Sequence, residues 1–268
     1  MPLTLRAISL GKILKEAFSI YGEHFVMFLG ISAIPNLALL ALHFGLEKFP
    51  VVRPHAPGWT GLLAALGVSF ASLFASSIVT AATTVAVSDI YLNRTPDLWD
   101  CFSRLSGKAF RIVYAAFLVE IVVAVGFLFC LIPGFYWAGV YGIAIPAVVM
   151  ENISAFQSLQ RSEYLTKDSV ARIVIAFFMT AVFTGVLVAA LRAGAAALGL
   201  TPHPYGNIPS DRVLTLITTT IGGILFGPIS AIALALEYFD QRVRKEAFDI
   251  NQMMMAGPED LVTGTAAL

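Results

Sequence analysis

Long apolar stretches separated by short polar segments dominate the chain. A helix needs about 20 mostly apolar residues to span the hydrocarbon core of a bilayer. Six stretches meet or approach that length, and we expect each to be a transmembrane helix. They cover residues 25–45, 61–92, 111–131, 134–150, 170–200 and 213–239.

The third and fourth stretches are separated only by a short turn. Pro133 and Gly134 are typical turn residues and suit a hairpin between two crossing helices. The alternative is five crossings, with these two stretches forming a re-entrant pair. The near-full length of each stretch favours six crossings.

The positions of the basic residues predict the orientation, because Lys and Arg near helix ends mark the cytoplasmic side. If six spans alternate from a cytoplasmic N-terminus, most of the 17 Lys and Arg residues fall on inner segments. The exceptions are Lys48, Arg53, Arg192 and Arg212. We therefore expect both termini to lie in the cytoplasm.

Three inner segments place apolar residues three or four positions apart, as on one face of a helix. They begin near Leu10, Leu98 and Ala155, and each precedes a predicted transmembrane hairpin. Amphipathic helices of this kind lie in the bilayer interface. Pro96 and Asp97 suit the start of the second one. The chain thus has the pattern of three similar units, which indicates either internal duplication or the common texture of membrane hairpins with basic loops.

Composition agrees with a membrane protein, since 58% of the 268 residues are hydrophobic and 13% are charged. Soluble domains carry about a quarter charged residues. This excludes an ordinary cytosolic enzyme, and a net charge of zero argues against a nucleic-acid partner. We expect one all-α domain over residues 1–250 and a flexible tail over 251–268. Cys130 lies in an apolar run and is expected to be a small packing residue.

Two ionisable residues fall within predicted spans. Glu120 lies near the middle of the third span, where such a residue is costly and is a candidate functional group. It would serve either a proton or cation path or a buried hydrogen bond to another helix. Arg192 lies toward the outer end of the fifth span and can extend to the headgroups. The hydroxyl-rich second span indicates either tight helix packing or a polar lining.

Motifs of common catalytic and metal sites are missing from the sequence, including HExxH, GxSxG and phosphate-binding glycine loops. The four histidines are scattered and do not form a ligand set. We therefore expect a non-enzymatic protein without a cofactor or a metal.

Two stretches carry a resemblance to a known family. One covers residues 131–166, and the other covers 237–249 with Tyr-Phe-Asp-Gln-Arg-Val-Arg-Lys-Glu as its centre. Together with Leu10 and Gly11, they resemble the bacterial six-helix membrane domain attached to some glycerophosphoryl diester phosphodiesterases, and its stand-alone relatives. The resemblance implies the fold and topology of an inner-membrane protein. The phosphodiesterase activity belongs to a separate soluble domain, so we do not expect it here.

The second stretch also has a physical interpretation. Arg242 and Glu246 are four residues apart and can pair on one helix face. Arg242, Arg244 and Lys245 can also contact anionic headgroups. The candidate functional residues of the whole chain are polar groups in or near predicted spans: Glu120, Glu151, Arg161, Arg192, Glu237, Asp240, Arg242 and Arg244.

The sequence is compatible with three functional hypotheses. The leading hypothesis is a non-enzymatic inner-membrane protein that acts in membrane organisation, lipid interaction or assembly of a membrane complex, with membrane lipids and a membrane protein as partners. The alternative is a small transporter or channel with a polar path near Glu120. A lipid-modifying enzyme using Asp89, Glu151 or Asp240 is the third, although these acids lack a clear metal or nucleophile partner.

Overall fold

The computed structural model describes residues 10–47, 58–167, 169–199 and 210–246, and the tail expected at 251–268 lies outside them. The described residues form ten α-helices and contain no strand, which confirms an all-α protein. The helices are α1 (Leu10–Glu23), α2 (Phe25–Glu47), α3 (Trp59–Tyr91), α4 (Leu98–Ser106), α5 (Ala109–Phe129), α6 (Leu131–Tyr141), α7 (Ala144–Glu151), α8 (Ala155–Thr166), α9 (Val170–Ala197) and α10 (Ser210–Glu246).

Five segments among the described residues are long and apolar enough to cross a membrane, which confirms a polytopic membrane protein. They are Phe25–Leu46, Trp59–Tyr91, Ala109–Phe129, Leu131–Glu151 and Arg212–Glu246. The fifth predicted span corresponds to α9, in which the described apolar stretch, Gly185–Ala197, is shorter than a full crossing. A crossing by α9 therefore stays a prediction.

The structure differs from the sequence-based prediction at one turn and within one predicted span. The hairpin between α5 and α6 turns at Cys130, and Pro133 lies in the first turn of α6, where proline is tolerated. The predicted span 134–150 is interrupted between α6 and α7, because Pro146 fits the first turn of a new helix better than a helix interior. Cys130 is exposed at its turn and is not the packing residue we expected.

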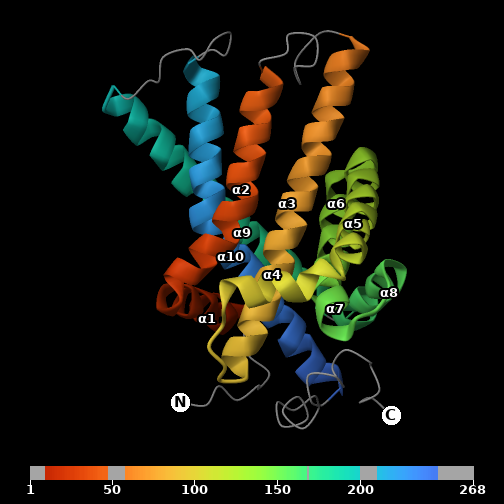
Figure 1. The fold of residues 1–268 in the computed structure, drawn as a ribbon. Helices are drawn as coiled ribbons and strands as arrows, with labels where there is room; N and C mark the ends of the chain where they lie inside the picture. Colours follow the sequence, from red (N-terminus) through yellow and green to blue (C-terminus); the bar gives the residue numbers. More distant parts are fainter. Residues whose placement is uncertain (1–9, 48–57, 168, 200–209, 247–268) are drawn as a thin grey trace.

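The three-unit pattern is present in the order of the helices. Each of the amphipathic helices α1, α4 and α8 precedes a hairpin, formed by α2–α3, α5–α6 and α9–α10 respectively. The middle hairpin is the shortest, since α6 has 11 residues whereas α3 has 33 and α10 has 37. Figure 1 shows the tip of the α5–α6 hairpin below the upper ends of α2 and α3.

Two of the amphipathic helices, α4 and α8, begin at capped positions. Asp97 accepts hydrogen bonds from the backbone N–H groups of Trp99 and Asp100, at 2.8 and 3.1 Å, and so caps α4 as its sequence predicted. Ser154 and Gln157 form a capping box at the start of α8. These caps satisfy backbone donors where each helix leaves the preceding loop.

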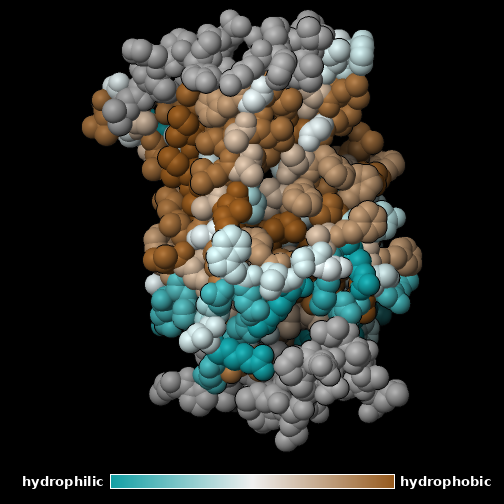
Figure 2. All heavy atoms as spheres, viewed as in Figure 1, coloured by the Kyte–Doolittle hydropathy of each residue, from teal (hydrophilic) through white to brown (hydrophobic). Residues whose placement is uncertain are grey.

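The hydrophobic core lies at the end of the molecule where the short helices gather (Figure 1). Helix α3 illustrates this, because most of its side chains before Ser77 are exposed or partly exposed and those from Val79 to Tyr91 are almost all buried. Figure 2 shows a broad apolar surface above and a belt of hydrophilic residues below. The polar belt and the packed core therefore share one end of the bundle, called the base below.

Candidate functional site: a buried charge layer and an apolar groove

The C-terminal half of α10 carries a run of buried polar side chains at the base. Glu237, Tyr238, Asp240 and Gln241 are each at most 3% exposed. They are buried because α10 packs against α1, α2, α3, α8 and α9. A buried polar group is costly unless it finds a partner, so the surrounding helices must supply complementary groups. We call the resulting clusters the charge layer.

The first cluster surrounds Glu151 at the end of α7. Arg161 donates from Nε to both carboxylate oxygens of Glu151, at 2.9 and 2.8 Å, and Tyr238 donates to Oε1 at 2.8 Å. Glu246 forms ion pairs with Arg161 and, at 3.3 Å, with Arg242. The predicted Arg242–Glu246 pair is thus confirmed, and the cluster joins α7, α8 and α10.

The Arg161 guanidinium stays charged in this cluster. Its burial opposes the charged form, but hydrogen bonds and charges from Glu246 and Glu151 outweigh that effect and raise the pKa of Arg161. Because donors already occupy both oxygens of Glu151, this carboxylate is suited to fixing helices in place.

The second cluster lies where α9 begins. Arg172 lies 3.2 Å from Glu237 through Nε and 2.8 Å from Asp240 through Nη2. Asp240 also pairs with Arg244 at 2.7 Å, and Gln241 donates to Glu237 at 2.9 Å. The second carboxylate oxygen of Glu237, Oε2, is buried and has no hydrogen-bond partner among the described residues. One partly buried arginine therefore pairs with two buried acids.

Two further contacts tie α3 to the remaining amphipathic helices. Asp89 pairs with Arg104 of α4 at 3.1 Å, and Arg104 also pairs with Asp100 in its own helix. Tyr91 donates to Glu16 of α1. Each of α1, α4 and α8 is thus attached to the base end of another helix by a polar contact with an acid or a tyrosine.

The structure keeps Glu120 and Arg192 apart from the charge layer. Glu120 is exposed on α5 and has no hydrogen-bond or ion-pair partner within the described ranges. Its predicted buried hydrogen bond is therefore wrong, because α5 buries Ile112, Ala115, Ala116 and Gly126, and Glu120 lies outside that face. Arg192 is exposed on α9. The other six candidate residues all belong to the two clusters.

Most hydroxyls of α3 bond to their own helix, whereas the buried hydroxyl of Thr83 has no hydrogen-bond partner among the described residues. Six of them donate to carbonyl oxygens three or four residues earlier, which satisfies them without another helix or a solute. They are Ser69, Ser72, Ser76, Ser77, Thr80 and Thr84. The pattern supports the packing interpretation of this span over the polar lining.

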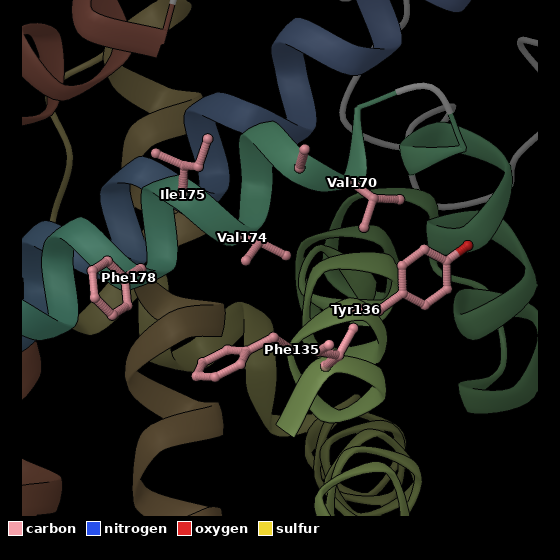
Figure 3. A pocket seen from close by; sticks show the side chains of 8 residues that line it. Phe135, Tyr136, Val170, Val174, Ile175 and Phe178 are labelled. Carbon is pink, nitrogen blue, oxygen red and sulfur yellow. The ribbon is translucent and has the colours of Figure 1, made fainter. Parts of the chain in front are cut away.

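An apolar groove, called the α6–α9 groove below, runs between those two helices. Its volume is about 590 Å³, within the usual range of small-molecule sites. Its lining consists of Ile132, Phe135 and Tyr136 of α6 with Val170, Ala171, Val174, Ile175 and Phe178 of α9 (Figure 3). Beside it, Gly139 allows the two helices to approach, because a Cβ there would lie 2.5 Å from a methyl of Val174.

Sequence reasoning missed several members of these sites. The sequence analysis used Arg172 only as one of the basic residues that predict the orientation. Its pairing with Glu237 depends on how α9 packs against α10. Tyr238 gave no signal beyond its position beside Glu237. The groove residues resemble any other apolar residues of the spans. Within the part of the chain that the structure describes, no group of three or more His, Cys, Asp and Glu could hold a metal ion.

The chain matches no protein family, no curated protein and no solved structure in the three comparisons. The resemblance to the phosphodiesterase-associated membrane domain therefore stays a prediction.

Proposed function

We propose that the protein is a non-enzymatic, multi-pass protein of the bacterial inner membrane that organises lipids at the cytoplasmic interface. The observation that carries this proposal is the attachment of α1, α4 and α8 to the base through Tyr91–Glu16, Asp89–Arg104 and Glu151–Arg161. Amphipathic helices held at a common level form a surface suited to the headgroup region. The same surface would serve for assembly with another membrane protein.

The proposed orientation places the base and both termini on the cytoplasmic side. The bias of Lys and Arg toward the predicted inner segments supports it. The face of the base seen in Figure 2 is hydrophilic, which suits a surface at the headgroup level.

We further propose that α5 and α6 form a re-entrant pair whose tip stays in the hydrocarbon. The tip exposes Leu128, Phe129, Leu131 and Ile132, which suits lipid better than water. Its one non-helical residue, Cys130, donates to the carbonyl of Gly126, so the turn needs little help from water. A re-entrant pair replaces two crossings of the six-span arrangement. Four crossings then remain, not the five of the alternative stated from the sequence, and the termini stay on one side.

A native mass spectrum of the protein extracted with its surrounding bilayer tests the main proposal. We expect phospholipids retained at a ratio different from that of the bulk membrane, and fewer of them after Arg161→Gln, which removes the ion pair between α8 and α7. A stoichiometric protein partner would favour assembly of a complex. Turnover of a substrate or movement of a solute by the purified protein alone would overturn the proposal.

We do not favour the transporter alternative. It relied on Glu120 and on the hydroxyls of the second span. Glu120 is exposed on the outside of α5, and six of the α3 hydroxyls are bonded within their helix. A polar path through the bundle therefore lacks support from the residues that suggested it.

A further inference from the structure

We infer that the α6–α9 groove binds one acyl chain of a phospholipid from the cytoplasmic leaflet. The inference rests on the proposed function and names its ligand and its place. The ligand must be apolar along most of its length, because the groove is lined by aliphatic and aromatic side chains with only the Tyr136 hydroxyl as a polar group.

The groove opens sideways, on the outside of the bundle. Tyr136, Ile175 and Phe178 line it and are about half exposed, so its mouth faces the surroundings of the protein. Val170 and Phe178 are eight residues apart, which corresponds to roughly 12 Å along a helix axis. That length is too short to seat a transmembrane helix, which needs about 30 Å, but it fits part of a lipid chain.

The two ends of the groove differ in polarity, as the two ends of a phospholipid do. The Val170 end lies at the start of α9, next to Arg172 of the charge layer and close in sequence to the exposed Lys167. The Phe178 end lies two turns further along α9, away from the charge layer. In Figure 3 the Tyr136 hydroxyl points away from the other lining side chains. We therefore place the headgroup near the α8–α9 junction and the chain toward Phe178.

Native mass spectrometry of the full chain in detergent tests this site. Phosphatidylglycerol is added in steps, and the affinity of the first lipid adduct is measured. Ala171→Trp fills the groove and is expected to weaken that first adduct by about tenfold or more, a shift of roughly 1.4 kcal/mol or more. Val186→Trp adds the same side chain at an exposed position of α9 outside the groove and should leave the adduct unchanged.

A second measurement covers the case in which Ala171→Trp does not fold. Ile175→Trp places a fluorescent probe at the mouth of the groove, after the native residues Trp59, Trp99 and Trp137 are replaced by Phe. Brominated phosphatidylglycerol should quench it with saturation at a low ratio of lipid to detergent. Quenching that rises only in proportion to the lipid fraction would overturn the site.

The outcomes separate this inference from the proposed function. A first adduct that persists in a folded Ala171→Trp protein overturns the groove but leaves lipid retention at α1, α4 and α8 standing. A free fatty acid that binds as tightly as phosphatidylglycerol overturns the assignment to a phospholipid. Loss of all retained lipid from the wild-type protein overturns both proposals.

Discussion

Tyr238 donates a hydrogen bond to Glu151 at 2.8 Å, and this contact joins α10 to the end of α7. Tyr238 is fully buried, and Glu151 also receives two hydrogen bonds from Arg161 of α8. Within two residues of Tyr238, Glu237 and Asp240 pair with Arg172 of α9. A short stretch of α10 therefore organises both clusters of the charge layer.

Removal of this hydroxyl should weaken the fold. Tyr238→Phe keeps the ring but takes one donor from a partly buried carboxylate, and we expect a loss of about 1–3 kcal/mol in the free energy of unfolding. Denaturant unfolding of the detergent-solubilised protein measures it. Tyr114→Phe is the matched control, because Tyr114 is exposed and its hydroxyl has no hydrogen-bond partner in the described residues. Equal stability of the two variants would contradict the structural role of Tyr238.

Arg172 should matter far more than Arg244, although both pair with Asp240. Arg172→Met leaves two buried acids without their main cation, and we expect it to cost about 3–5 kcal/mol. Arg244 is 38% exposed in its side chain, so Arg244→Met should cost at most about 1 kcal/mol. Thermal unfolding of both variants compares them.

A rescue experiment checks the reason for that difference. Addition of Glu237→Gln and Asp240→Asn to Arg172→Met removes the unpaired charges, so the triple variant should unfold at a higher temperature than Arg172→Met alone. A triple variant that is less stable than the single variant would show that the loss does not come from stranded carboxylates.

The two cysteines provide a test of the re-entrant pair. Burial raises the pKa of the Cys101 thiol to about 12, with a further contribution from the charge of Asp89, so Cys101 should not react with maleimides at mildly alkaline pH. Cys130 is exposed at the hairpin turn. We expect no labelling of Cys130 by an impermeant maleimide from either side of the membrane, and full labelling after denaturation.

The control for this test is a cysteine on the proposed cytoplasmic face. Thr95→Cys, at an exposed loop position and combined with Cys101→Ser and Cys130→Ser, should be labelled in inside-out vesicles only. Labelling of Cys130 from the outer side of intact cells would mean that the hairpin crosses the membrane.

Glu120 and Glu151 should respond in opposite ways to one substitution. Glu120→Leu removes an exposed carboxyl that has no partner among the described residues from the middle of α5, and we expect higher thermal stability in a bilayer, since an ionisable side chain that faces hydrocarbon is costly. Glu151→Leu removes one of the two acids that pair with Arg161 and also the acceptor of the buried Tyr238 hydroxyl, so it should lower stability by several kcal/mol. Loss of stability in Glu120→Leu would indicate a partner for Glu120 outside the described residues.

Local sequence patterns predicted where the helices lie, but they did not predict which helices contact one another. Apolar runs and helical periodicity located most of the spans and the amphipathic helices, because both signals reside in neighbouring residues. The Arg242–Glu246 pair was predictable for the same reason, being one helical turn apart. Arg172 and Glu237 are 65 positions apart, and their pairing depends on how α9 packs on α10, which no local pattern records. The exposure of Glu120 likewise depends on which face of α5 the other helices cover.

The uneven burial of α3 has a mechanical consequence. Its half near the base is interlocked with neighbouring helices, whereas the side chains of the other half are mostly exposed, and in Figure 1 the far end of α9 diverges from the bundle. In a bilayer, lipid tails would fill the space between the diverging segments. Lateral pressure would then hold those segments in place, while the base would respond as one rigid piece. Stretching or thinning of the membrane would act first on the splayed ends.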